Sequence, residues 1–187
     1  KLTLSVLTLA MVVIILARPR AGAKSETTKV RGIEVMIALD VSNSMRASST
    51  DDPNGVSRLQ RSKLILEKLI NKLGDDKVGL IVFAGNAYTQ LPITSDFMSA
   101  KMFLSSISTN MVPTQGTAIG AAVNMAMNSF SQNEKSGKAI ILITDGENHE
   151  DDAVGAAKEA AKKGIQVNVI GMGTGKGSPI PTGGQGN

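Results

Sequence analysis

A carboxylate and two hydroxyls follow an apolar, β-branched stretch of this 187-residue chain. The stretch reads I-E-V-M-I-A-L from Ile33, and Asp40, Ser42 and Ser44 come after it at alternate positions. A parallel strand buried on both faces has such an apolar run, and open α/β sheets gather ligands beyond the carboxyl ends of their strands. One charged and two neutral oxygens placed this closely suit a hard divalent cation such as Mg²⁺. The motif therefore predicts a metal site.

The D-x-S-x-S pattern resembles the metal-ion-dependent adhesion site (MIDAS) of von Willebrand factor A (VWA) domains. That resemblance implies a Thr from a second loop and an Asp from a third loop at the same metal. Candidates stand in P-T-Q-G-T-A-I-G, before a helical pattern, and at the end of the apolar run A-I-I-L-I-T-D. The resemblance covers residues 31–173. It implies these ligands for Mg²⁺, with Mn²⁺ or Ca²⁺ as alternatives: Asp40, Ser42, Ser44, Thr117 and Asp145.

In VWA domains one coordination position of the metal stays open for a carboxylate of a partner protein. The resemblance therefore implies a partner that supplies an Asp or Glu. The mixture of ligands supports this role, because a cation held partly by neutral hydroxyls keeps enough positive charge to attract one more anion. We therefore expect a binding module and not an enzyme.

Other interpretations of the same residues are weaker. Asp40 and Asp145 could each cap the helix after their strand, but two serines and a threonine in the expected places favour a metal site. His149 is the only histidine, yet no paired base or nucleophile is identifiable for a catalytic role. The acidic residues around it are expected to form a solvated rim and helix-start charges: Glu147, Glu150, Asp151 and Asp152.

Strand-like and helical patterns alternate along the segments that would position this site. Apolar runs predict strands over residues 33–39, 78–84, 138–144 and 165–170. Helical spacing predicts helices over residues 57–73, 96–107 and 117–130, and a further helix that ends at Gly164. Gly85-Asn86 is a hairpin signal, so the Pro-containing residues 87–94 are expected to return antiparallel at a sheet edge. The order predicts an α/β fold of VWA or Rossmann-like type, with a doubly wound, mostly parallel sheet and one antiparallel edge strand.

An apolar run opens the chain and stops at Arg18-Pro19-Arg20. Residues 2–17 carry no charge, but their number falls just short of the roughly 17 to 20 that cross a bilayer. Because the sequence begins at Lys1 without an initiator Met, we interpret residues 1–18 as a transmembrane helix, clipped at its start. A signal-peptide core, which lacks a clear small-residue cleavage site here, and a buried helix of the domain are the alternatives.

Composition divides the chain into regions of different character. Residues 1–31 hold six basic residues against Glu26, a net +5, which leaves −1 of the total +4 for the rest. The domain is therefore not basic, and without Trp and with few aromatics it shows no nucleic-acid surface. We expect a linker over residues 19–31, the VWA domain over 32–173, and over 174–187 a Gly- and Pro-rich tail or a truncated end of the domain.

Four segments of the chain are similar to the bacterial Bat (aerotolerance) group of VWA proteins. They are the apolar run with its A-R-P-R junction, V-M-I-A-L-D-V-S-N-S-M, T-Q-G-T-A-I-G and L-I-T-D-G-E-N-H. The resemblance implies an inner-membrane protein linked to MoxR-type AAA+ ATPases and other VWA proteins, with a role in stress or complex assembly. Basic residues after the apolar run place the domain in the cytoplasm by the positive-inside rule. The family implies the periplasm, which we favour.

Two other functions stay open. A chelatase-like subunit would use the same metal to dock a hexameric ATPase through a carboxylate of the motor. A Mg²⁺-dependent phosphatase would use Asp40 as phosphoryl acceptor, but Ser42 stands where such enzymes have a second Asp. G-M-G-T-G-K-G-S is not a Walker A motif, because Ile170 and Gly177 occupy the positions that need Gly and Ser or Thr.

Overall fold

The computed structural model describes most of the chain after residue 31. It covers residues 32–52, 54–133, 136–146, 151–173 and 179–180, together with the isolated positions 3, 6, 7 and 11. The chain divides into two units, Lys1–Val30 and Arg31–Asn187. Apart from those isolated positions and residues 179–180, the predicted transmembrane helix, linker and tail lie outside the described residues. No helix within the described ranges is long and apolar enough to cross a membrane.

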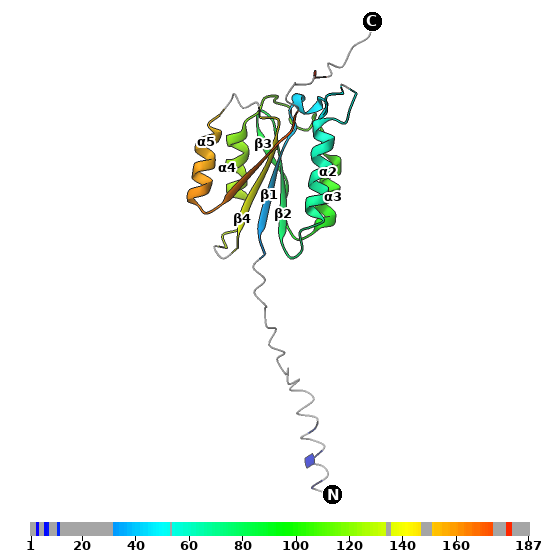
Figure 1. The fold of residues 1–187 in the computed structure, drawn as a ribbon. Helices are drawn as coiled ribbons and strands as arrows, with labels where there is room; N and C mark the ends of the chain where they lie inside the picture. Colours follow the sequence, from blue (N-terminus) through cyan, green and yellow to red (C-terminus); the bar gives the residue numbers. More distant parts are fainter. Residues whose placement is uncertain are drawn as a thin grey trace. The chain divides into compact units, whose positions relative to one another are not determined.

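The second unit is built on a five-stranded sheet in the order β3-β2-β1-β4-β5 (Figure 1). Central β1 pairs in parallel with β2 and β4, and β4 pairs in parallel with β5. β3 returns antiparallel to β2 at one edge, as the hairpin signal and Pro92 predicted. The predicted fold class is thereby confirmed. The strands are β1 (Glu34–Asp40), β2 (Lys77–Phe83), β3 (Ala87–Thr94), β4 (Lys138–Thr144) and β5 (Gln166–Gly171).

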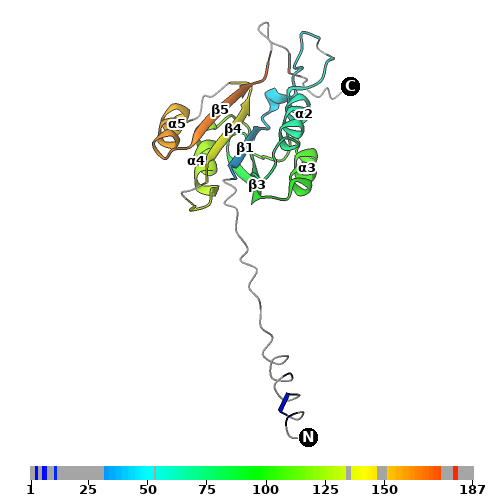
Figure 2. The same ribbon diagram turned by 60° about the horizontal axis from the view of Figure 1, so that its bottom comes forward.

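Helices cover both faces of the sheet (Figures 1 and 2). One face carries α2 (Arg58–Ile70) and α3 (Phe97–Ser106), and the other carries α4 (Ile119–Ser129) and α5 (Ala153–Lys162). Every residue of β1 is buried, and its side chains alternate between the two faces. Ile37 and Leu39 pack with α2 and α3, whereas Met36 and Ala38 pack with α4 and α5. This double burial is why β1 reads as a continuous apolar run.

Side-chain caps begin three of these helices. Ser57, Asp96 and Asp152 each accept a hydrogen bond from the backbone N–H three residues on, at 3.2, 3.1 and 2.8 Å. The predicted end of the first of these helices, at residue 73, is wrong. Helix α2 ends at Ile70, because the bonds from Lys72 N and Leu73 N reach back only three residues and tighten the chain into a turn.

Candidate metal centre

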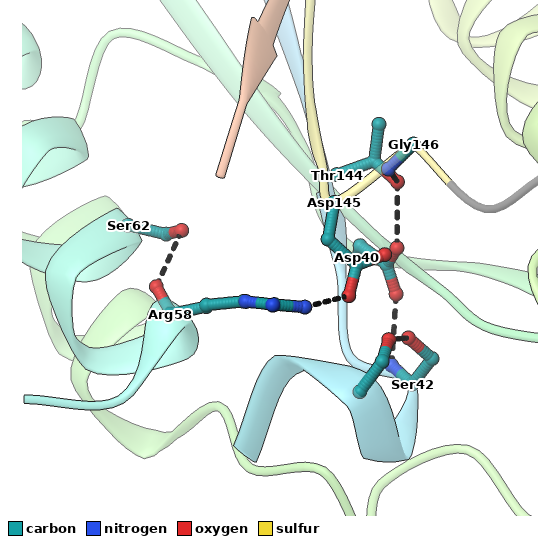
Figure 3. A network of polar contacts seen from close by, with 8 residues as sticks. Asp40, Ser42, Arg58, Ser62, Thr144, Asp145 and Gly146 are labelled. Atoms are coloured by element: carbon teal, nitrogen blue, oxygen red, sulfur yellow. Dashed lines mark hydrogen bonds and ion pairs between the residues drawn. The ribbon is translucent and has the colours of Figure 1, made fainter. Parts of the chain in front are cut away.

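The carboxyl ends of β1 and β4 bring two of the predicted ligands together. Asp40 is the last residue of β1, and Asp145 follows the last residue of β4. The two strands are parallel neighbours, with Leu39 opposite Ile143, so the residues that follow meet at one edge of the sheet. Figure 3 shows the two carboxylates side by side at this edge.

Both oxygens of the buried Asp40 carboxylate are held by hydrogen bonds. Ser42 N donates to Oδ1 at 2.8 Å, and Thr144 Oγ1 donates to Oδ2 at 2.8 Å (Figure 3). Gly146 N donates in turn to Thr144 Oγ1 at 3.1 Å, which directs the threonine proton toward Asp40. A carboxylate oxygen accepts more than one hydrogen bond or ligand, so each oxygen keeps a lone pair for a cation. The positioning role of Thr144 was not predicted, although it is the T of the quoted L-I-T-D-G.

The two predicted serines lie on a tight turn over the end of β1. Asn43–Arg46 forms a 3₁₀ helix, η1, with Ser42 as its N-cap. This turn brings Ser42 Oγ within 2.9 Å of Ser44 Oγ, and Ser42 itself lies against Asp40 (Figure 3). Two hydroxyls this close can present lone pairs to the same cation. Four residues are too few to show a helical period, which is why η1 was not predicted.

Thr117 lies on a loop that is held against the serine turn. Gln115 Oε1 accepts a hydrogen bond from Asn43 N at 3.1 Å, and Ala118 N donates to Ala84 O, just beyond β2, at 2.7 Å. Gly116 turns the chain before Thr117 with a φ of 131°, which a residue with a Cβ rarely adopts. The buried Thr117 makes no side-chain hydrogen bond to a residue that the structure describes. Its hydroxyl therefore stays available to a ligand.

Arg58 enters the site although the sequence did not point to it. Its Nη1 donates to Asp145 Oδ2 at 2.7 Å, and the two side chains are only 10% and 2% exposed (Figure 3). Gly173, just beyond β5, lies against the guanidinium, since a Cβ there would be 3.9 Å from Nη2. One signal was present in the sequence: a cation in a first helical turn opposes the helix dipole. Nothing in S-R-L-Q, however, identified a partner 87 residues away.

Burial dominates the electrostatics of the site. It raises the pKa of Asp40 to about 6, against the hydrogen bonds from Ser42 and Thr144, and the charge of Asp145 raises the pKa further. Asp145 Oδ1 and Arg58 Nε are buried without a hydrogen-bond partner among the described residues. A buried carboxylate oxygen without a partner costs free energy unless a cation or water satisfies it.

The donor set fits a hard divalent cation. Two carboxylates and nearby hydroxyls supply oxygen alone, and one carboxylate oxygen has no hydrogen-bond partner among the described residues. Within the described part of the chain, no group of three or more His, Cys, Asp or Glu could hold a metal. Among the described residues, coordination at this edge therefore draws on the hydroxyls as well as on the two carboxylates.

The acidic segment after Asp145 does not add ligands in the described structure. His149 and its neighbours over residues 147–150 lie outside the described residues. Asp151 is half-buried rather than part of a solvated rim, and it accepts hydrogen bonds from Gly120 N at 2.9 Å and Ala121 N at 2.7 Å. It therefore caps α4, the helix that follows Thr117.

Comparisons with known proteins agree with this architecture. A family model for the von Willebrand factor type A domain matches residues 35–147. The crystal structure of an aerotolerance-related membrane protein from Bacteroides fragilis is 56% identical, with a TM-score of 0.77, and covers 83% of this chain and 75% of its own. BatB from Bacteroides thetaiotaomicron, described as a conserved hypothetical protein, is 57% identical with a TM-score of 0.77, over 83% of this chain and 74% of its own.

Two more distant similarities extend these comparisons. An uncharacterized protein of Borreliella burgdorferi is 29% identical over 92% of this chain, which spans 50% of that protein's length. Proximal thread matrix protein 1 from the mussel byssus, whose MIDAS motif is occupied by zinc, is 23% identical with a TM-score of 0.61, over 77% of this chain and 39% of its own. The chain belongs to the von Willebrand factor type A domain family, and the predicted resemblance to its aerotolerance-related Bat group is confirmed.

Proposed function

We propose that this VWA domain binds a partner protein through a divalent cation. The proposed ligands are those of the sequence motif: Asp40, Ser42, Ser44, Thr117 and Asp145. One observation carries the proposal. The edge of the sheet gathers two adjacent hydroxyls and two carboxylates, and one buried oxygen of Asp145 has no partner among the described residues. A cation at this edge satisfies that oxygen and offsets the burial of both carboxylates.

Each residue of this edge has a distinct task in the proposal. Ser42 and Ser44 present neutral oxygens, and the backbone N–H of Ser42 locks the carboxylate of Asp40 beside them. Thr117 brings a hydroxyl from a separate loop, so the cation links two loops. When bound, the cation supplies an electrophilic position for one more oxygen ligand. That ligand is proposed to be an Asp or Glu of the partner.

Mg²⁺ is the proposed ion, with Mn²⁺ and Ca²⁺ as alternatives. Oxygen donors without nitrogen or sulfur suit these hard cations. The zinc in the MIDAS motif of the mussel protein supports a metal at this place in the fold. Mg²⁺ keeps several waters when it binds protein oxygens, which fits a site with few carboxylates.

The biological setting is proposed from the Bacteroides relatives. The protein from Bacteroides fragilis is described as an aerotolerance-related membrane protein. We propose that this chain is likewise anchored in a bacterial inner membrane, with its VWA domain in the periplasm. Its proposed partners are a MoxR-type AAA+ ATPase and other VWA proteins, in a stress or complex-assembly system. A chelatase-like subunit is the second candidate, because docking an ATPase would use the same metal and the same carboxylate chemistry.

A phosphatase function is disfavoured by the surroundings of Asp40. A phosphoryl-accepting Asp of that kind is followed two residues on by a second Asp, and Ser42 occupies that position here. The proposed role is therefore binding without catalysis. Release of phosphate from a generic ester, abolished by Asp40→Ala, would contradict this part of the proposal.

Calorimetric titration with Mg²⁺ and Mn²⁺ tests the proposed function. We expect Asp40→Asn to abolish binding, because it removes the buried charge, and Thr117→Ala to weaken binding at least about tenfold. Asp96→Asn is the matched control. Asp96 caps α3 and follows the antiparallel strand β3, so it lies at the end of the sheet opposite the carboxyl ends of β1 and β4 and has no part in the site. A folded wild-type chain that binds neither ion contradicts the proposal.

A further inference from the structure

The ion pair between Arg58 and Asp145 places a cationic side chain inside the proposed metal site. A guanidinium beside a divalent cation is repelled by it, so its presence needs a reason. Helix stability does not supply one, because Arg58 is the first residue of α2, where the helix dipole disfavours positive charge. Packing holds the side chain in place, since Gly173 lies against one part of the guanidinium and Asp145 accepts from another.

The net charge of the site follows from these three side chains. Asp40 and Asp145 together carry −2, which would fully balance a divalent cation. Arg58 contributes +1, so the protein supplies only −1 and a loaded site keeps a charge of +1. The two carboxylate oxygens of Asp145 have different surroundings. Oδ2 accepts a hydrogen bond from Arg58, whereas Oδ1 is buried without a partner among the described residues. One carboxylate can thus face the arginine and the cation at once.

We infer that Arg58 is a specificity-determining residue of the site, which neutralises Asp145 so that the bound cation retains positive charge for a carboxylate ligand. This inference rests on the proposed metal site. Arg58 weakens binding of the metal alone and strengthens binding of an anionic ligand to the loaded site. Metal and partner then bind cooperatively, because the partner's carboxylate replaces the charge that Arg58 cancels. A neutral ligand gains nothing from this arrangement.

Four proteins form a charge series that tests the inference. Counting Asp40, Asp145 and Arg58, the wild type carries −1, Arg58→Gln carries −2, Asp145→Asn carries 0, and the double variant carries −1. We expect the Mn²⁺ affinity to rise about tenfold in Arg58→Gln and to fall at least as much in Asp145→Asn. The second substitution in the double variant should restore affinity toward the wild-type value. Calorimetry measures all four affinities.

Acetate serves as the carboxylate probe in the same titrations, at constant ionic strength set with chloride. It should tighten Mn²⁺ binding to the wild type and to the double variant, and have little effect on Arg58→Gln. Arg61→Gln is the matched control, because Arg61 lies on the same helix and, among the described residues, donates a hydrogen bond only from Nη1 to Ser49 O, at 3.5 Å. This control should reproduce the wild-type values for both metal and acetate.

The outcomes separate the inference from the proposed function. If the wild type binds Mn²⁺ but Arg58→Gln has unchanged metal and acetate responses, the inference is wrong and the metal site stands. Arg58→Gln leaves a buried carboxylate without its ion-pair partner and could fail to fold. The comparison of Asp145→Asn with the double variant then decides, and equal affinities overturn the inference. A wild type that binds no metal overturns the proposed function and the inference with it.

Discussion

At the scale of single residues, the site is organised around a carboxyl group that resists ionisation. Asp40 is fully buried, and burial raises its pKa to about 6 from the ordinary 3.8. The folded chain without metal therefore holds a proton on Asp40 more tightly than the unfolded chain does. The stability that this proton contributes is fully present below pH 3.8 and is lost as the pH rises through about 6.

A pH series tests the ionisation of Asp40. The difference between about 6 and 3.8 corresponds to roughly 3 kcal/mol, so in EDTA the wild type should lose about that much free energy of unfolding relative to Asp40→Asn between pH 3 and pH 7. Urea unfolding at each pH measures the difference in free energy of unfolding between the two proteins. All other titrating groups are common to both proteins, so their contributions cancel in this difference. Mn²⁺ affinity should rise over the same range, because the proton competes with the metal. A constant difference between the two proteins would refute the assignment.

At the scale of elements, the site depends on contacts between loops. Gln115 links the loop that carries Thr117 to the serine turn, and Arg46 Nε donates to Thr109 Oγ1 at 3.1 Å. Asp151, from the segment after β4, accepts two backbone hydrogen bonds at the start of α4. The three ligand-bearing loops are therefore tied to one another by polar contacts outside the ligand set.

Removing the cap of α4 tests this coupling. Asp151→Asn should lower the free energy of unfolding by about 1 kcal/mol, because it weakens two hydrogen bonds at the helix start. It should also weaken Mn²⁺ binding severalfold, since α4 begins just after Thr117. Asp152→Asn is the control: it loses the same charge and caps α5. Denaturant unfolding and calorimetry give both quantities, and equal metal affinities in the two variants would argue against the coupling.

At the scale of the whole molecule, a cation bound at the proposed site would join elements that are distant in the sequence. The proposed ligands lie at the end of β1, just after β1 and β4, and just before α4, so the cation would link segments up to about a hundred residues apart in the sequence. A ligand that binds only the folded state stabilises it by RT ln(1 + L/Kd), where L is the free ligand concentration, so the stabilisation keeps growing with the logarithm of that concentration. Two buried hydrophobic clusters, one on each face of the sheet, supply the core of the domain, so we expect a cation to add stability rather than to be required for folding.

Metal removal tests this expectation. At a free Mn²⁺ concentration of 100 times Kd, the folded state should gain about 2.7 kcal/mol, which corresponds to a rise in Tm of roughly 5 to 10 °C for a domain of this size. Differential scanning calorimetry with Mn²⁺ and with EDTA measures the change. Thr117→Ala should show a smaller shift at the same Mn²⁺ concentration. An unfolded chain in EDTA would instead show that the metal is part of the fold.

The sequence by itself determined the strands, the sheet edge and the identity of the motif. The apolar run of β1 is continuous because this strand is buried on both faces. Gly85-Asn86 and Pro92 mark the antiparallel edge strand because turn formation and the missing backbone N–H of proline depend on those residues alone. Asp40 and Asp145 were found for the same reason, since each interrupts an apolar run where its strand ends.

Only the tertiary structure decided which other groups meet these residues. Thr144 bonds Asp40 across 104 positions, and Arg58 bonds Asp145 across 87. Such pairs leave no periodicity or spacing in the sequence, because packing of the strands and helices brings them together. The sequence therefore identified the oxygens that suit a metal. The fold revealed the arginine that lowers the negative charge around them.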